Sequence, residues 1–135
     1  MTRFLILVAI LGLSSVYGIW FNKNQGKMKE HTSAALTSSE LGSPLGERVT
    51  LVQFSSAFCM PCKATRVLLQ EISQGLPDVV HIDIDAESHL DLVRKLNILS
   101  TPTTLILDSH GIELGRAVGA PKREQVLDAI TPISI

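Results

Sequence analysis

The sequence is short of aromatic residues, of cysteine and of an excess of either charge, and these shortages exclude several classes of protein. Its 135 residues include four Phe, one Tyr, one Trp and two Cys, and 12 Lys and Arg stand against 13 Asp and Glu. Because basic residues are not in excess, the chain lacks the charge with which nucleic-acid binders attract phosphates and release counterions. The length is that of a single domain. We therefore expect one domain that does not bind nucleic acid.

Most of the aromatic residues that do occur lie in one uncharged run, residues 4–21, FLILVAILGLSSVYGIWF. As a helix this run would span about 27 Å, close to the roughly 30 Å hydrocarbon core of a bilayer. Tyr17 and Trp20 suit a membrane interface. The run predicts a single-pass membrane anchor over residues 1–21, with the membrane as its partner. A cleaved signal sequence and a buried helix of a soluble protein are the alternatives.

The segment after the apolar run is polar. Residues 22–47 are rich in Ser, Gly and Lys, and they predict a tether with a short ordered piece near Ala34–Leu36. Residues 48–135 then form the domain. Outside the apolar run the chain has only two aromatic side chains, Phe54 and Phe58. The core must therefore consist of Leu, Ile, Val and Ala almost throughout.

Short apolar runs alternate with helical patterns through residues 48–135. Val49–Phe54 is a continuous β-branched and apolar run, which is typical of a strand buried on both faces. A helix follows and ends near Gln74. Further strands are expected at Asp78–Ile84, Thr103–Leu107 and Ile112–Val118, and further helices at Leu90–Leu96 and Lys122–Ile130. This order predicts an α/β fold, with a mixed central sheet and helices on both faces.

The two cysteines, Cys59 and Cys62, form a C-x-x-C motif at the junction between the first strand and its helix. A structural zinc site needs four Cys or His ligands, and no pair of suitably spaced histidines accompanies the motif among His31, His81, His89 and His110. A purely structural disulfide would close a loop of only four residues and gain little stability. The motif therefore favours redox exchange and no metal.

The position of the motif also indicates the role of each thiol. A helix N-terminus presents unsatisfied N–H groups and a partial positive charge, which stabilise a thiolate over a thiol. In such motifs the cysteine pKa falls from about 8.5 to between roughly 3.5 and 7. Cys59 comes first and is the more accessible, so we expect it to be the nucleophile. Cys62 lies one turn into the helix, and we expect it to be the resolving thiol.

At this point the sequence resembles the thioredoxin family. The likeness runs from Val49 to Ile130. It includes FSSAFCMPCKATRVLLQEI, VVHIDID and LNILSTPTTLIL, and it continues through the DSHG turn and VGAPKREQVLDAI. It implies a thioredoxin-like fold in which Pro102 is cis and faces the disulfide, and in which the Thr101 backbone pairs with an extended substrate. It also implies substrate contacts at Phe58, Met60, Pro61, Thr101 and Pro102. We expect Phe54 to pack beneath the motif and Phe58 to line the surface that faces the substrate.

Three departures from the family pattern lie close to the cysteines. Phe58 stands where a tryptophan is usual, Gln53 stands where the family has a buried acid, and His81 stands where a lysine accompanies that acid. Gln53 cannot take a proton, whereas His81 can titrate near neutrality. His81 is thus a candidate for proton transfer, with a satisfied strand histidine as the alternative. The segment from Thr32 to Glu47 replaces a longer N-terminal strand and helix.

The resemblance implies a protein-disulfide oxidoreductase that needs no cofactor. The proline in Met60-Pro61 resembles that of the reducing members, so we expect a reductant of exported protein disulfides, with protein thiols and a redox donor or acceptor protein as partners. A non-catalytic peptide-binding module for a membrane partner is the alternative. A peroxide-scavenging enzyme would need an Arg and a Thr beside its reactive cysteine, which this motif does not supply.

The distribution of basic residues bears on the orientation in the membrane. Arg3 precedes the apolar run and Lys23, Lys27 and Lys29 follow it, a pattern that slightly favours a cytoplasmic domain. The anchor, the tether and the trimmed N-terminus nevertheless resemble exported thioredoxin-like proteins of bacteria. We therefore expect a single-pass protein of the cell membrane whose redox domain lies outside the cytoplasm.

Overall fold

A computed structural model describes residues 1–24, 28–30 and 35–134. Its centre is a five-stranded sheet with the order β1-β5-β4-β2-β3. The central strand β2 (Val49–Ser55) pairs in parallel with β3 (Val79–Asp85) and antiparallel with β4 (Thr103–Leu107). Strand β5 (Glu113–Val118) runs antiparallel to β4, and β1 (Met28–Glu30) runs antiparallel to β5. The expected mixed sheet is confirmed, and the strands after residue 48 begin and end within one residue of their predicted bounds.

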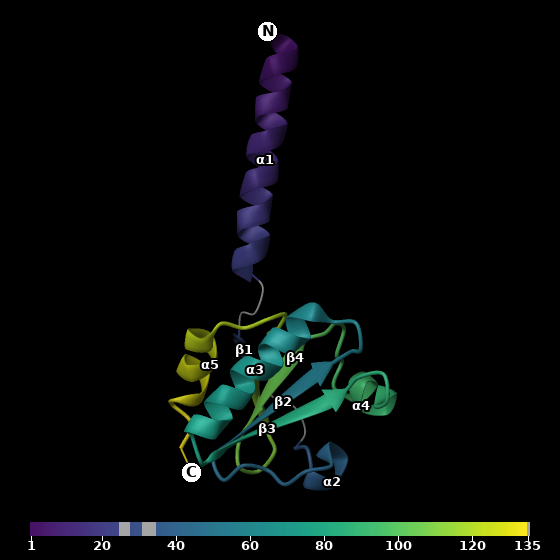
Figure 1. Ribbon diagram of the computed structural model, residues 1–135, viewed down its shortest axis with the longest axis vertical. Coiled ribbons are helices and arrows are strands. Elements are labelled where there is room, and N and C mark those ends of the chain that lie inside the picture. The colour runs from purple at the N-terminus through teal and green to yellow at the C-terminus, as the bar shows by residue number, and fades with distance from the viewer. Residues whose placement is uncertain (25–27, 31–34, 135) are drawn as a thin grey trace.

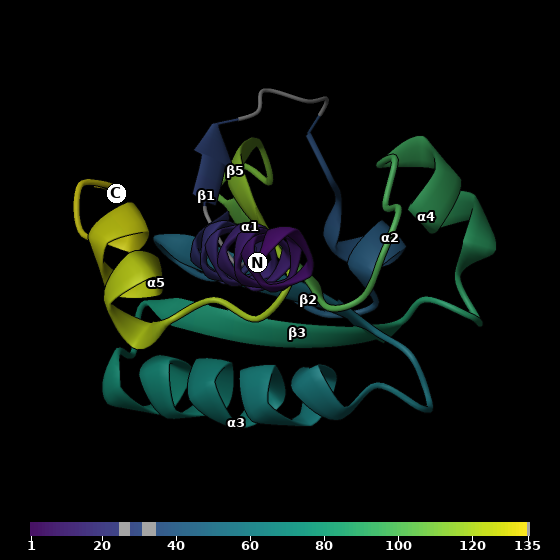
Figure 2. The same cartoon turned by 90° about the horizontal axis from the view of Figure 1, so that it is seen from above.

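Helices cover both faces of the sheet, as expected (Figures 1 and 2). Helices α3 (Met60–Gly75) and α5 (Arg123–Ile130) lie against one face, and the shorter α4 (Leu90–Lys95) and α2 (Ser38–Leu41) lie against the other. Every residue of β2 is buried, which confirms the expectation drawn from its continuous apolar run. Its side chains alternate between two clusters, because successive residues of a strand point to opposite faces. Val49 and Leu51 pack toward α3 and α5, whereas Val52 and Phe54 pack toward α4 and α2.

The α4 face also holds a buried ion pair on β5. The Arg116 Nε lies 2.5 Å from the Glu113 Oε1, and the Arg116 Nη1 donates to the Leu96 carbonyl at 2.9 Å. Arg116 is the partner of Leu105 across the β4–β5 ladder, which places it on the same face as the apolar cluster around Phe54. The guanidinium therefore joins the sheet to the end of α4.

The polar segment 22–47 contributes more to the domain than the short ordered piece that we expected. It supplies β1 at one sheet edge and α2 on one face, and the Leu36 N–H donates to the Gly111 carbonyl at 2.8 Å. Helix α2 begins with a capping box, in which Thr37 and Glu40 satisfy each other's backbone N–H groups. Glu40 also pairs with Lys95 of α4. Ala34, the first residue of the expected piece, lies outside the described residues.

Helix α1 (Thr2–Asn24) contains the whole uncharged run and stands apart from the sheet (Figure 1). Its span Thr2–Lys23 is long and apolar enough to cross a membrane, although a signal sequence near an N-terminus would pass the same test. The hydroxyls of Ser14 and Ser15 donate to the carbonyls of Ile10 and Leu11, one turn earlier. The two serine hydroxyls within the run are thus satisfied inside the helix, which is what an apolar environment requires.

Candidate redox site

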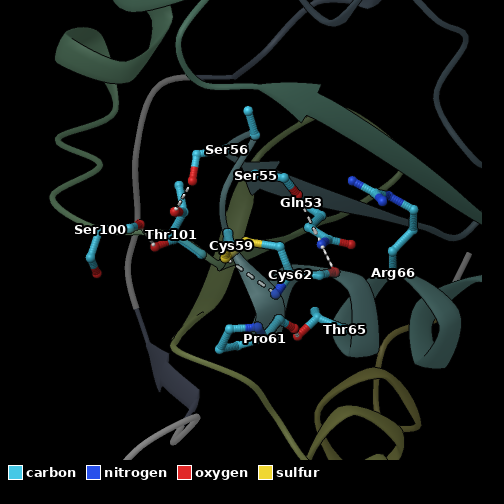
Figure 3. Close-up of a disulfide and its surroundings, with 12 residues drawn as sticks. Gln53, Ser55, Ser56, Cys59, Pro61, Cys62, Thr65, Arg66, Ser100 and Thr101 are labelled. Carbon is cyan, nitrogen blue, oxygen red and sulfur yellow. Dashed lines mark hydrogen bonds between the residues drawn. A yellow bond between two sulfur atoms is a disulfide. The ribbon is translucent and has the colours of Figure 1, made fainter.

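The two cysteines form a disulfide at the start of α3 (Figure 3). Cys59 is the N-cap residue of the helix, and its Sγ accepts a hydrogen bond from the Cys62 N–H at 3.2 Å. Pro61 stands in the first turn, where its missing N–H removes no intrahelical hydrogen bond. Cys59 is partly exposed, whereas Cys62 is 1% exposed. Cys59 is therefore the more accessible of the two cysteines.

Three large apolar side chains near the motif point into solvent. Phe58 is 100% exposed and Met60 is 74% exposed, and they flank Cys59 in the sequence. Leu99 is 86% exposed in the loop between α4 and β4, shortly before Thr101. The sequence interpretation missed Leu99, although an apolar residue between Ile98 and Ser100 in a loop is a visible signal. We call Phe58, Met60 and Leu99 the apolar rim.

The peptide bond between Thr101 and Pro102 is cis, which confirms the expectation from the family pattern. The Pro102 carbonyl accepts from the Gly119 N–H at 2.9 Å. In the part of the chain that the structure describes, neither the Thr101 N–H nor its carbonyl takes part in a hydrogen bond. Only its side chain is engaged, because the Thr101 Oγ1 lies 3.0 Å from the Ser56 Oγ. A backbone donor and a backbone acceptor therefore remain open at this residue.

Beneath the disulfide, Gln53 occupies the position where we noted the loss of a buried acid. Its side chain is fully buried, and its Nε2 donates both to the Cys62 carbonyl and to the Ser55 Oγ at 2.9 Å. A carbonyl can only accept, so the contact with Cys62 fixes which end of the amide is the nitrogen. The Gln53 Oε1 then faces the Nε2 of His81 at 3.0 Å. It follows that this ring nitrogen carries a hydrogen, and that Nδ1 is the basic nitrogen of neutral His81.

The polar contacts continue from Ser55 to the surface of α3. The Ser55 Oγ donates to the Asp83 Oδ1 at 2.8 Å, and the Arg66 Nε donates to the Asp83 Oδ2 at 2.5 Å. Arg66 lies one turn beyond Cys62, so the contacts begin and end on the helix that carries the disulfide. We call Gln53, Ser55, His81 and Asp83, together with Arg66, the polar floor.

The surroundings of His81 favour its neutral form. Burial lowers the pKa of His81 from its ordinary 6.5, the Asp83 carboxylate opposes this shift, and the Arg66 guanidinium adds to it. At neutral pH the ring is therefore uncharged and can accept a proton at Nδ1. The sequence interpretation singled out His81 but missed Ser55 and Asp83. The period-two pattern of β2 and β3 could have found both, because it places them on the same face as Gln53 and His81.

One expectation about the site is wrong. Phe54 does not pack beneath the motif, because it follows Gln53 in β2 and so points to the opposite face, into the cluster beside α4. The residue that does lie beneath α3 at this level is Gln53, through its contact with the Cys62 carbonyl. Phe58 lies on the surface, as expected.

Comparison with known proteins agrees with the geometry. The family model described as Thioredoxin matches residues 27–132, most of the chain. The chain belongs to the thioredoxin family. Thiol-disulfide exchange is the general activity that membership implies, and Cys59 and Cys62 supply the pair of sulfurs that it requires. The match begins before β1, in agreement with the contribution of segment 22–47 to the fold.

The individual relatives are distant and partial. The chain is 30% identical to Thioredoxin of Mycoplasma genitalium over 78 residues, which are 58% of this chain and 76% of that protein. It is 31% identical to Thioredoxin H4-1 of Oryza sativa subsp. japonica over 77 residues, 57% of this chain and 58% of the relative. Among solved structures, reduced Schistosoma mansoni thioredoxin aligns with a TM-score of 0.58 at 28% identity, covering 66% of this chain and 82% of that one.

Proposed function

We propose that the protein is a membrane-anchored oxidoreductase that reduces disulfides of exported proteins. The observation that carries the proposal is the asymmetry of the pair: Cys59 is partly exposed and receives the Cys62 N–H, while Cys62 is buried behind it. An N–H directed at sulfur stabilises a thiolate, which is the nucleophile in exchange. The arrangement thus favours attack by Cys59 and resolution by Cys62.

The reaction begins from the reduced dithiol. The Cys59 thiolate attacks one sulfur of a substrate disulfide, the substrate S–S bond breaks, and its leaving sulfur takes a proton. Cys62 then loses its proton and attacks the Cys59 Sγ, which releases the second substrate thiolate. Two electrons pass to the substrate and the Cys59–Cys62 disulfide remains. A donor protein with a dithiol must reduce it again.

The surface around Cys59 suits a polypeptide substrate. The apolar rim of Phe58, Met60 and Leu99 offers contacts to apolar side chains, and the open N–H and carbonyl of Thr101 offer pairing to an extended backbone. We propose that Phe58, Met60, Pro61, Thr101 and Pro102 contact the substrate. The substrate would be a protein disulfide in an exposed, extended and apolar segment.

We also propose that His81 assists the ionisation of Cys62. Among the described residues no hydrogen bond joins the ring to a sulfur, but Gln53 joins its Nε2 to the Cys62 carbonyl, and its Nδ1 is unprotonated at neutral pH. His81 would then act through its charge and through Gln53. The test is the pH profile of substrate release in His81→Gln. A profile unchanged from that of the wild type would reject the role.

The location is proposed from α1. An exposed apolar helix of this length suits a retained anchor, and we propose that the redox domain lies outside the cytoplasm. A fusion of alkaline phosphatase to the C-terminus tests this orientation, because the enzyme is active only after export. An inactive fusion in intact cells would reject it.

The experiment that tests the activity is reduction of insulin disulfides by the full chain, with dithiothreitol as electron source. We expect reduction by the wild type, trapped mixed disulfides with Cys62→Ser, and none with Cys59→Ser. Failure of the wild type would favour the peptide-binding module. A reduction potential more oxidising than about −150 mV would reverse the direction, since reductants of this superfamily lie near −270 mV.

A further inference from the structure

Two loops border the disulfide, and one hydrogen bond between side chains joins them. The first loop, residues 56–59, leads from β2 into α3, and the second, residues 99–102, leads from α4 into β4. The Ser56 Oγ and the Thr101 Oγ1 lie 3.0 Å apart, and both side chains are partly buried (Figure 3). Among the described residues it is the only side-chain hydrogen bond between these loops. We call it the Ser56–Thr101 bridge.

The other contacts of the second loop hold it to its own side of the site. The Thr103 Oγ1 donates to the Ser100 carbonyl at 2.7 Å, and the Gly119 N–H donates to the Pro102 carbonyl at 2.9 Å. These bonds attach the loop to β4 and to the end of β5. Neither reaches the loop that carries Cys59. The separation between Thr101 and Cys59 therefore depends on the bridge more than on any other hydrogen bond of the loop.

That separation matters for a polypeptide substrate but not for a small one. A polypeptide that pairs with the open backbone groups of Thr101 must also present its sulfur to Cys59, so two points of contact have to be in register. A small disulfide meets Cys59 alone. Displacement of one loop would thus impair the first substrate and spare the second.

We propose that Ser56 and Thr101 are positioning residues, whose bridge sets the register between backbone pairing at Thr101 and attack by Cys59. This inference rests on the proposed function, because it requires that the protein reduces polypeptide disulfides. It adds a role for Ser56, which contacts neither sulfur. It also adds a second role for the Thr101 side chain, distinct from the backbone pairing described above.

The test compares two substrates with the full chain in detergent. Ser56→Ala and Thr101→Val each remove one hydroxyl, and the double variant removes both. We expect kcat/KM for insulin to fall about 2- to 12-fold through a rise in KM, the range that one neutral hydrogen bond supplies. The rate of Ser56→Ala with 5,5′-dithiobis(2-nitrobenzoate), a small disulfide, should not change. The double variant should lose no more than either single variant, because all three lack the same bond.

Two further variants make the result specific. Thr101→Ser keeps the hydroxyl and should retain the wild-type KM for insulin. Ser73→Ala removes a hydroxyl that bonds within α3, to the Gln70 carbonyl, and should also leave both substrates unaffected. Equal losses with insulin and the small disulfide, additive losses in the double variant, or a loss in Thr101→Ser would each overturn the proposal. A wild type that reduces neither substrate would instead reject the proposed function.

Discussion

Gln53 and Phe54 are neighbours in β2 and both are fully buried, yet they lie in opposite surroundings. Gln53 faces α3 and shares its hydrogen bonds among Ser55, His81 and the Cys62 carbonyl. Phe54 faces α4 and packs among aliphatic side chains. The same segment of strand thus carries a polar face toward the disulfide and an apolar face away from it.

The difference shows how the domain separates stability from chemistry. On the α3 face, the polar side chains that bond beneath the disulfide gather at the end where β2 and β3 finish. At the other end of the same face, Val49, Leu51 and Val79 pack against Leu69 and Ile72. Aliphatic packing elsewhere supplies most of the apolar surface that the domain buries. The site can therefore keep buried hydrogen-bonding groups, which bury little apolar surface themselves.

The largest effect is expected from truncation of the Phe54 side chain on the apolar face. Phe54→Ala should lower the free energy of unfolding by about 3–5 kcal/mol, because it removes the largest buried side chain and leaves a cavity. The folded variant should still reduce a small disulfide at the wild-type rate. Urea unfolding followed by far-UV circular dichroism measures the first effect. Phe58→Ala is the matched control, and its stability should change by less than about 0.5 kcal/mol because Phe58 is fully exposed. Similar losses in both variants would contradict the assignment of Phe54 to the core.

The polar face should show a smaller loss of stability and a larger loss of function. Gln53→Leu should cost about 1–3 kcal/mol of unfolding free energy, since it leaves buried partners at Ser55 and His81 unsatisfied. It should also slow the release of mixed disulfides, because the Cys62 carbonyl loses its contact. Urea unfolding and quenched-flow trapping measure the two effects. Gln70→Leu, at an exposed position of α3, should change neither. Wild-type release kinetics in Gln53→Leu would show that the amide only fills space.

Unfolding measured over a range of pH tests one residue of the polar face, His81. Because burial lowers the pKa of folded His81 below 6.5, the unfolded chain binds this proton more readily. Titration of His81 therefore leaves stability unchanged above pH 6.5 and lowers it as the pH falls below 6.5, with Asp83 opposing and Arg66 reinforcing the pKa shift. Urea unfolding between pH 7.5 and 5 should show a steeper decline for the wild type than for His81→Gln. Parallel curves for wild type and His81→Gln would contradict the lowered pKa.

The smallest effect is expected at the solvent end of the polar floor. Arg66→Gln should change the free energy of unfolding by about 0–1 kcal/mol, since the Arg66 side chain is 38% exposed and its ion pair with Asp83 is screened by water. The change should shrink further as salt is raised. Thermal unfolding at low and high ionic strength measures it. A loss well above 1 kcal/mol would mean that Arg66 stabilises the Asp83 carboxylate as strongly as a partner stabilises a buried charge.

The comparison also shows what the sequence could and could not predict. Strands such as Thr103–Leu107 were found because apolar runs and turn residues are local signals. Strand β1 was missed because Met-Lys-Glu has no strand pattern, and its structure comes from pairing with β5. At the site, the cysteines and the cis proline follow from motifs. The bridge between Ser56 and Thr101 joins residues 45 positions apart, which no local pattern relates.

The distribution of aromatic residues has a spectroscopic consequence. The only Trp and the only Tyr of the chain both lie in α1, where the ring centroid of Tyr17 is 6.2 Å from those of Trp20 and Phe21. The redox domain therefore carries no indole or phenol. Its intrinsic ultraviolet fluorescence is weak and hardly responds to whether Cys59 and Cys62 are oxidised or reduced. All tryptophan emission reports on the surroundings of α1. In lipid vesicles, the emission maximum and its quenching by brominated acyl chains would measure the depth of Trp20 without any added label.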